Sequence, residues 1–379
     1  MKAAGRFTKL LLLLFAVWLL IPLQDLTGVI KLKPLYGDTK TPPPLANTAN
    51  WFNASFQANI ENVATQHFGL RPFFIRSRNQ VVMSAFAESP NPEVIMGRER
   101  YLFDRQGLDQ LHAVNPSQLS FIQQQRIRLE TIHARLQEQD IEFLLVIAPS
   151  KAAHLPEFAP KSEWRHFSPN NYYAAFKKEL DTASFPVLDF NAWFGELKTI
   201  NPAPLFSKGG LHWSSFGAYL AADSILRFYD RDDSLRKYWA ENYNLTDDVR
   251  EEDQDLYRLM NVFVPGKPLP MVYPEIEYNS RPRGQRGLLV LGDSYYETIA
   301  SLGIMDSLFR NQDSYWFYNN IVFRGHGQEN PSVKSLSLKD ELARKQLVIM
   351  LVHTTNLPLL PFDFDTDLEA VLGSVTQNP

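Results

Sequence analysis

Short aliphatic runs alternate with segments of helical periodicity along the chain, a pattern typical of buried parallel strands joined by helices. Mostly apolar runs predict five strands, at Phe143–Ala148, Val187–Phe190, Gly287–Leu291, Trp316–Tyr318 and Leu347–Val352. Apolar residues three and four positions apart predict the helices between them, at residues 170–181, 215–228 and 296–310. This order predicts an α/β fold, with a parallel sheet and helices on both of its faces.

Residues 1–31 have the layout of an export signal. Lys2, Arg6 and Lys9 precede Leu10–Leu23, a run without any charge, and basic residues before a short apolar stretch are typical of secretory signals. Bulky residues stand near its end, where a cleavage site needs small ones. We therefore expect an uncleaved signal anchor, with the rest of the chain exported; a cleaved signal is the alternative.

The remainder is expected to form three parts. Residues 32–90 are predicted to be a spacer followed by an N-terminal helical segment, including an amphipathic helix at Asn53–His67. Residues 91–365 form the α/β domain, and residues 366–379 form a tail. A charge-rich helical insertion at about 230–260 interrupts the domain. A solvated helical face is the favoured interpretation of this insertion, and a lid over a substrate groove is the alternative.

Composition excludes several classes of function. The formal net charge of -4 over 379 residues gives no basic footprint for nucleic acid. The chain has no cysteine, which excludes disulfides, thiolate nucleophiles and cysteine-ligated zinc. No HExxH motif, calcium loop or glycine-rich phosphate loop is present, so we expect neither a metal site nor a cofactor.

The segment Gly292-Asp293-Ser294 is the first candidate for chemistry. It ends the apolar run Gly287–Leu291, and Tyr295–Phe309 then has helical spacing. A serine at a strand-to-helix turn exposes its hydroxyl beside helix N–H groups, as acyl transfer requires. Asp293 in such a turn usually accepts backbone N–H groups. An ordinary helix N-cap is the alternative interpretation.

Several segments in the same order resemble the AlgX/AlgJ-type SGNH-hydrolase-like family, the periplasmic O-acetyltransferases of bacterial exopolysaccharides. They are Phe68-Gly69-Leu70-Arg71, Val94–Phe103, Val146–Lys151 with Leu155-Pro156-Glu157, Leu188-Asp189, His212-Trp213 with Gly217-Ala218, and Gly292-Asp293-Ser294. The resemblance implies an SGNH-hydrolase-like fold, flavodoxin-like in its three layers. It also implies a polysaccharide acceptor and a membrane-bound O-acyltransferase partner that hands over the acetyl group.

The resemblance also assigns roles to site residues. Ser294 would be the nucleophile, with its backbone N–H as an oxyanion donor, and His212 the base that activates it. The family motif is Asp-x-His-Trp, but Gly210 stands where the aspartate should be. The imidazole would then be held by a backbone carbonyl or by a carboxylate elsewhere; the candidates are Asp189, Asp293 and Glu297.

Four further residues are candidates for oxyanion or substrate contacts. They are Asn319, Lys151, His154 and Trp213. Together with the resemblance, they predict an exported, membrane-anchored O-acetyltransferase acting on a cell-surface or secreted polysaccharide. Two alternatives remain: an acetylesterase of the same fold, or an inactive carbohydrate-binding or assembly subunit that has lost its triad at Gly210.

Overall fold

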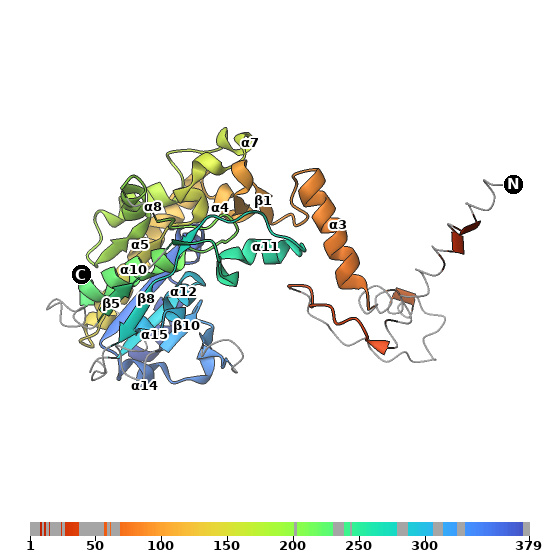
Figure 1. The fold of residues 1–379 in the computed structure, drawn as a ribbon. Coiled ribbons are helices and arrows are strands. Elements are labelled where there is room, and N and C mark those ends of the chain that lie inside the picture. Colours follow the sequence, from red (N-terminus) through yellow and green to blue (C-terminus); the bar gives the residue numbers. More distant parts are fainter. Residues whose placement is uncertain are drawn as a thin grey trace. The chain divides into compact units, whose positions relative to one another are not determined.

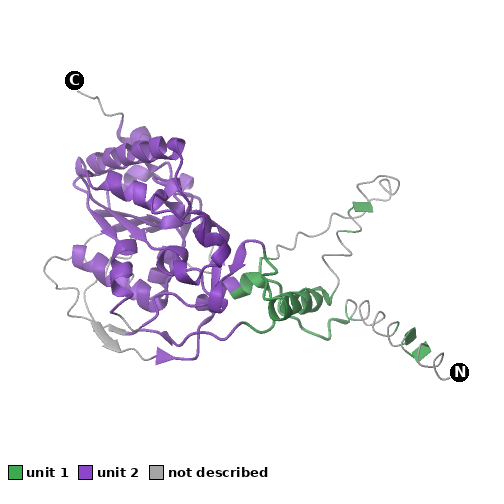
Figure 2. Cartoon of the chain, turned by 90° about the horizontal axis from the view of Figure 1, so that it is seen from above, with its two compact units in different colours: residues 1–91, 257–265 green, residues 92–256, 266–379 purple. Residues whose placement is uncertain are grey.

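The computed structural model describes residues 8–9, 11–12, 15, 24, 27–37, 57–58, 61, 69–200, 203–229, 239–242, 245–278, 287–305, 314–323 and 330–373. The chain divides into two compact units (Figure 2): residues 1–91 with 257–265, and residues 92–256 with 266–379. Most of the predicted anchor and of the helix at Asn53–His67 lies outside the described residues. Within the residues described, no helix has the length and apolar character needed to cross a membrane.

The first unit is built around α3 (Arg71–Ala85), which begins with a proline in its first turn. Asn79 is buried on this helix, and its amide donates a hydrogen bond of 2.8 Å to the carbonyl oxygen of Met260. This contact joins α3 to the returning segment 257–265 within the same unit.

The second unit contains a six-stranded sheet, of which Figure 1 labels β10. The order of its strands is β11-β10-β9-β12-β3-β4. Its strands are β3 (Glu142–Ala148), β4 (Val187–Asp189), β9 (Leu288–Gly292), β10 (Ser314–Phe317), β11 (Ile321–Phe323) and β12 (Leu347–His353). All neighbours pair in parallel except β11, which is an antiparallel edge strand. The last parallel strand in the sequence, β12, therefore lies in the middle of the sheet, between β9 and β3.

Helices cover both faces of this sheet. Leu144, Val146 and Ala148 of β3 share one apolar core with α9 (Phe190–Leu197), α10 (Ser215–Tyr229) and α12 (Tyr295–Ser301). The alternate residues Phe143, Leu145 and Ile147 pack into the other core, with α5 (Pro116–Gln137), α8 (Tyr172–Leu180), α14 (Leu338–Leu342) and α15 (Phe364–Leu372). Because successive side chains point to opposite faces, a strand buried on both sides must be apolar throughout.

Shorter elements complete the unit. They are β1 (Val94–Met96), η2 (Arg98–Arg100), β2 (Leu102–Asp104), α4 (Arg105–Asp109), α6 (Lys151–His154), η3 (Pro156–Phe158), α7 (Lys161–Trp164), β5 (Trp239–Asn242), β6 (Leu245–Thr246), η5 (Glu251–Gln254), α11 (Asp255–Met260), β7 (Met271–Val272), β8 (Glu275–Tyr278), η6 (Val333–Ser335) and η7 (Thr354–Leu359). The last part of α11, residues 257–260, belongs to the first unit. Strand β1 pairs with β2, β5 with β8, and β6 with β7, all antiparallel.

The predicted α/β fold is confirmed, and each of the five predicted strands is present with its ends within two residues of the prediction. The antiparallel edge β11 and the central position of β12 were not predicted. The charge-rich insertion also differs from a solvated helical face. It contains β5 and β6, and Asp253 and Leu256 in it are buried.

Candidate active site

Ser294 lies at the turn where β9 ends and α12 begins, on the carboxyl edge of the sheet. Gly292 allows this turn to approach β12 closely, because a Cβ there would lie 2.9 Å from the carbonyl oxygen of Leu351. Ser294 is the N-cap residue of α12, but its side chain makes no capping hydrogen bond. The N-cap alternative therefore does not account for its hydroxyl, which is half-buried and directed at His212.

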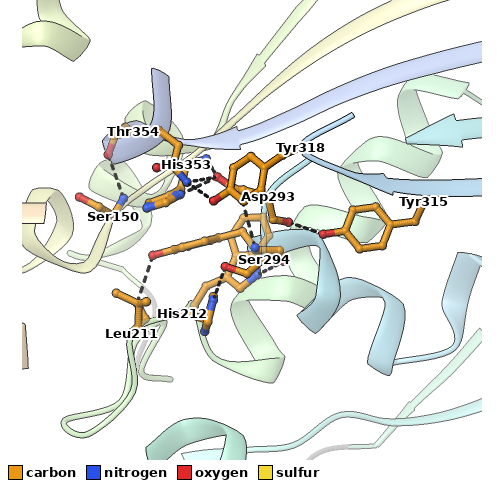
Figure 3. Close-up of polar contacts among 12 residues, drawn as sticks. Ser150, Leu211, His212, Asp293, Ser294, Tyr315, Tyr318, His353 and Thr354 are labelled. Carbon is orange, nitrogen blue, oxygen red and sulfur yellow. Dashed lines mark hydrogen bonds and ion pairs between the residues drawn. The ribbon is translucent and has the colours of Figure 1, made fainter. Parts of the chain in front are cut away.

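Asp293 holds the turn in place from a fully buried position (Figure 3). Its Oδ1 accepts the N–H of Tyr295, while Oδ2 accepts the N–H and Nδ1 of His353 and the amide of Asn356. The carbonyl oxygen of Asp293 accepts the Tyr315 hydroxyl at 2.7 Å. Burial alone would raise the pKa of this carboxyl, but His353 and the backbone N–H donors outweigh it and lower the pKa. Asp293 thus stays ionised and fastens the turn to β12.

His212 reaches Ser294 from a loop that precedes α10. Its Nε2 lies 2.8 Å from the Ser294 Oγ (Figure 3), and its Nδ1 lies 2.8 Å from the Oδ2 of Asp255. The two ring nitrogens are therefore both engaged, one by the hydroxyl and one by the carboxylate. The side chains of His212 and Asp255 are 23% and 18% exposed, so the group is partly shielded but open to a reactant.

Asp255 is the first residue of α11 and was not among the carboxylates proposed from the sequence. Its second oxygen, Oδ1, accepts the backbone N–H of Leu211 at 2.7 Å, so the carboxylate grips both the imidazole and the loop that carries it. Asp255 lies 43 positions after His212 in the sequence, inside the charge-rich segment. The only local signal for Asp255 is an aspartate at the start of a short helix, followed by Leu256 and Tyr257. This signal is weak, because many helices begin with an aspartate.

Gly210 leaves room for the segment that brings Asp255. A Cβ at this position would lie 2.6 Å from the Ser207 Oγ and 3.0 Å from the carbonyl oxygen of Asp253. The Ser207 hydroxyl accepts the Gly210 N–H and donates to that same Asp253 carbonyl, while the Leu256 N–H donates to the carbonyl of Gly209. An aspartate at 210 and this packing therefore exclude each other.

The loop before His212 has its carbonyl groups held by two buried side chains. The Lys151 Nζ donates to the carbonyl oxygens of Lys208 and Gly210, at 2.8 and 2.9 Å. The Tyr295 hydroxyl donates to the carbonyl oxygen of Leu211 at 3.1 Å. Lys151 also lies over the rings of Tyr101 and Phe103. These contacts fix the backbone from which the imidazole extends.

Opposing effects set the pKa values in this cluster. Burial alone would lower the pKa of His212, but the hydrogen bond and charge of Asp255, with the charges of Asp293 and Glu297, raise it above its usual value. Burial lowers the pKa of Lys151 to about 7, against the attraction of Asp255 and other carboxylates. A histidine with a raised pKa is a stronger base, which suits the removal of a hydroxyl proton.

The three carboxylates proposed from the sequence have other places. Asp189 caps α9 by accepting the Ala192 N–H, and it also binds Tyr173 and Lys177. Asp293 holds the turn, as described above. Glu297 lies in the first turn of α12 and adds negative charge near His212. It is Asp255, and none of these three, that forms the hydrogen bond with the Nδ1 of His212.

The four proposed contact residues are all buried within the fold. They are Asn319 at 8% exposure, Lys151 at 0%, His154 at 8% and Trp213 at 1%. Asn319 donates to the Phe362 carbonyl and to Asp367, and the Trp213 indole donates to the Tyr295 carbonyl. His154 packs against Phe206, and burial lowers its pKa to about 4. The structure therefore brings Ser294 and His212 together but gives these four residues supporting positions.

The geometry meets the requirements for nucleophilic catalysis. A hydroxyl, an imidazole and a carboxylate lie in series within hydrogen-bond distance, which is the arrangement that activates a serine. The Ser294 backbone N–H lies at the start of α12, beside the hydroxyl. It is suited to donate a hydrogen bond to an oxyanion that forms there. Among the described residues, no group of three or more histidine or acidic side chains is placed to hold a metal ion.

Comparisons with known proteins identify a family for the part of the chain that holds these residues. The model of the family "SGNH hydrolase-like domain, acetyltransferase AlgX" matches residues 94–307, more than half of the chain. That range contains His212, Asp255 and Ser294. No curated protein matches the sequence.

Solved structures with similar folds include three from bacteria. The O-acetyltransferase domain of Pseudomonas putida AlgJ is 20% identical over 74% of this chain and 99% of its own, with a TM-score of 0.49. Bacillus cereus PatB1 is 14% identical over 70% and 96%, with a TM-score of 0.45. Pseudomonas aeruginosa AlgX is 13% identical over 76% and 68%, also with a TM-score of 0.45.

Proposed function

Because the chain belongs to the family of SGNH hydrolase-like acetyltransferase domains of the AlgX type, we propose that it transfers acetyl groups to a polysaccharide through Ser294. The single observation that supports this proposal best is the series of hydrogen bonds from Asp255 to His212 to Ser294. It supplies a nucleophile, its base and the carboxylate that orients the base, all from the residues of one unit.

The first half of the reaction makes an acetyl ester on Ser294. His212 Nε2 takes the proton from the Ser294 hydroxyl as its oxygen attacks the carbonyl carbon of the donor ester. Asp255 keeps the proton of the ring on Nδ1 and stabilises the imidazolium that forms. The bond to the leaving alcohol then breaks, and His212 returns the proton to that alcohol.

The second half repeats these steps with a sugar hydroxyl. His212 removes its proton, the sugar oxygen attacks the acetyl group, and the bond to Ser294 breaks as the proton returns to the serine. Water competes with the sugar at this stage, and the outcome decides between transfer and hydrolysis. A polysaccharide acetylesterase is therefore the alternative with the same residues.

This proposal removes the reason for regarding the chain as an inactive subunit. It rested on Gly210 and the absence of an aspartate at the motif position. With Asp255 on the imidazole, the chain does not need an aspartate at 210 in order to act as an enzyme.

We further propose that the unit with Ser294 works outside the cytoplasm, tethered by the N-terminal anchor. The support is the charge pattern of Lys2, Arg6 and Lys9 before the apolar run Leu10–Leu23. A membrane-bound O-acyltransferase would then be the partner that delivers acetyl groups across the membrane, by analogy with the family.

The proposal is tested by isolating the acetyl ester. The purified chain is incubated with an activated acetyl ester, quenched in acid and digested, and the peptides are analysed by mass spectrometry. We expect one acetyl group on Ser294, none in Ser294→Ala, and wild-type labelling in the matched control Ser301→Ala, which changes an exposed serine on the same helix. Undiminished turnover of the ester by Ser294→Ala would refute the proposal.

A second measurement separates transfer from hydrolysis. Glycan is added to the acetylated chain, and the acetate released is compared with the acetate found on the sugar. Acetate on the sugar supports the transferase, whereas free acetate at the same rate with and without glycan supports the esterase.

A further inference from the structure

Exposed large hydrophobic side chains are concentrated in the first unit, which is green in Figure 2. Most of its described residues lie in three segments, 27–37, 69–91 and 257–265. Of the twenty exposed large hydrophobic side chains in the described part of the chain, these segments carry nine: Val29, Ile30, Tyr36, Phe73, Phe74, Val81, Phe86, Phe263 and Val264. Single exposed apolar residues are normal, but such a concentration marks a contact surface.

Five of these side chains form one apolar patch along α3. They are Phe73, Phe74, Val81, Phe263 and Val264, each between 43% and 64% exposed. The ring centroid of Phe73 lies 5.6 Å from that of Phe74 and 5.7 Å from that of Phe263. The Gln80 side chain accepts the backbone N–H groups of Phe263 and Val264, at 3.0 and 2.9 Å, and so holds that segment beside the helix. Val81 is seven positions after Phe74 and therefore lies on the same side of α3.

The same three segments are strongly basic, although the whole chain has a formal net charge of -4. Against one acidic residue, Glu88, they contain six basic residues: Lys31, Lys33, Arg71, Arg76, Arg78 and Arg258. Arg76 donates to the carbonyl oxygens of Lys33 and Pro34 and Arg258 lies over the ring of Tyr36, so these contacts cancel neither charge. Arg78, four positions after Phe74, is exposed beside the patch. Apolar side chains among positive charges suit a surface with an apolar interior and negative groups outside.

The apolar run Leu10–Leu23 leads directly into this unit. At the end of the run, the Gln24 side chain donates to the carbonyl oxygen of Ile30 at 2.8 Å and accepts its N–H at 3.0 Å. Farther on, the Asn261 side chain accepts the N–H of Tyr36 at 2.8 Å and donates to its carbonyl oxygen at 3.2 Å. When the run enters a bilayer, as the proposed anchor does, these short and fixed connections keep the unit at the membrane surface.

We propose that the apolar patch and the basic residues of its segments bind an anionic lipid surface, with α3 lying along the interface. Helices that bind lipid in this way bury their apolar face about 5–10 Å into the boundary between headgroups and acyl chains. The folded unit then adds a second membrane contact to that of the apolar run. The binding does not depend on chemistry at Ser294, so this proposal and the proposed acetyl transfer can fail separately.

The experiment measures the depth of α3 in the full-length chain, reconstituted into vesicles of phosphatidylethanolamine and phosphatidylglycerol. Because the chain has no cysteine, Ser77→Cys gives a single site for a nitroxide label, four positions from both Phe73 and Val81 and therefore within the patch. Ser120→Cys gives the matched site on an exposed part of α5. Electron paramagnetic resonance reports how accessible each label is to oxygen, which enters lipid, and to a nickel chelate, which stays in water. We expect the label at 77 to be about tenfold less accessible to nickel than the label at 120, and more accessible to oxygen.

Two glutamate variants provide the comparison. Val81→Glu places a negative charge in the patch and should return the label at 77 toward water, raising its nickel accessibility about fivefold. Ile127→Glu makes a similar change on α5 and should leave that label where it is, since the two side chains are 55% and 54% exposed. Melting temperatures check that both variants fold, and Val264→Glu, at a site that is 64% exposed, replaces Val81→Glu if the latter does not.

Each outcome decides the proposal. A label at 77 that is open to oxygen, closed to nickel and released by Val81→Glu supports it. Equal nickel accessibility at 77 and 120 places α3 in water, and a label shielded from both reagents shows that protein covers the patch; either result overturns it. If the chain proves to be cleaved near residue 25, the released product is mixed with the same vesicles, and the same reading of the label at 77 decides. Acetylation of Ser294 by an activated ester, measured in detergent without vesicles, reports on the proposed function independently.

Discussion

Asp255 supplies at the residue scale the carboxylate that the family motif places two positions before the histidine. Its two oxygens have different tasks, because Oδ2 faces the His212 ring and Oδ1 holds the Leu211 N–H. The same carboxylate therefore orients the imidazole and anchors the backbone beside it. The carboxylate of Asp255 on α11 thus replaces an aspartate at position 210, and the packing around α11 requires glycine at 210.

Asp255→Asn is expected to reduce acetyl-ester turnover by about 10⁴-fold, the effect known for such a change in serine proteases. The pH profile should also move. His212 must be neutral to act as a base, and Asp255 raises its pKa, so activity of the wild type falls as the pH drops through that raised pKa. Without the carboxylate the pKa falls, and the acid limb of the residual activity should shift to lower pH.

Rates of ester hydrolysis measured from pH 5 to 9 test this expectation. Asp223→Asn is the matched control, since it makes the same change at a carboxylate of similar exposure on α10, where Asp223 pairs with Arg227. An unchanged acid limb in Asp255→Asn would show that Asp255 does not set the protonation of His212.

Gly210→Ala and Gly210→Asp should both lower stability, and neither should increase activity. A Cβ at 210 would be 2.6 Å from the Ser207 Oγ, which is fixed between the Gly210 N–H and the Asp253 carbonyl. Overpacking of this kind costs about 1–3 kcal/mol. Thermal unfolding measures it, with Gly195→Ala as the control because no atom lies within 4 Å of a Cβ there. A faster enzyme in Gly210→Asp would mean that Asp255 is not the effective carboxylate.

At the scale of elements, the site is assembled where loops leave the carboxyl ends of neighbouring parallel strands. The turn after β9 provides Ser294, the turn after β3 provides Lys151, and the end of β12 provides His353, which holds Asp293. The loop with His212 is not on a strand, so it must be fixed by side chains, and Lys151 and Tyr295 hold its carbonyls.

Most of these strands and two of the three site residues are predictable from the sequence, because each depends on residues close together in the chain. The strands, Ser294 and His212 each have a signal within a few residues: an aliphatic run, a Gly-Asp-Ser turn, or a His-Trp pair before an apolar helix. Asp255 has no such signal. Its place depends on long-range packing, through the Ser207–Asp253 and Gly209–Leu256 hydrogen bonds. The central position of β12 has no local signal either, because the order of the strands depends on pairing between distant segments, here β12 with β3 and β9.

Lys151→Met should reduce kcat without lowering the melting temperature. The pKa of Lys151 falls from its usual 10.5 to about 7, so keeping it charged costs of the order of 4 kcal/mol of folding free energy near pH 7. Leaving the carbonyls of Lys208 and Gly210 without their donor costs about 1–3 kcal/mol each, which together is of the same size. The methionine therefore leaves the stability near pH 7 roughly unchanged while it frees the loop that carries His212.

The pH dependence distinguishes this from simple repacking. Burying the ammonium destabilises the fold fully below pH 7, and the effect vanishes as the pH rises toward 10.5, where the unfolded lysine is also neutral. The stability of Lys151→Met relative to the wild type should therefore fall over that interval, as seen in melting curves at several pH values. A melting temperature and a kcat that fall together would instead assign Lys151 a purely structural role.

At the scale of the whole molecule, the charge distribution bears on where the chain works. Its formal net charge of -4 is spread over 379 residues, but the N-terminal segment is basic before its apolar run. Basic residues that flank an apolar segment stay on the cytoplasmic side of a membrane. The proposed acetyl transfer to an exported polysaccharide requires the unit with Ser294 to be on the other side.

A reporter enzyme that is active only outside the cytoplasm tests this topology when it is fused after Pro379. We expect activity from the fusion and recovery of the full-length chain with the membranes after alkaline washing, because an uncleaved apolar run resists extraction. Replacing Lys2, Arg6 and Lys9 with glutamate removes the orienting charges and should lower reporter activity, whereas the same replacement at Lys31 and Lys33, beyond the apolar run, should not. A soluble product that begins near residue 25 would exclude the anchor but leave export intact, and a silent reporter in every fusion would exclude export and with it an exported acceptor.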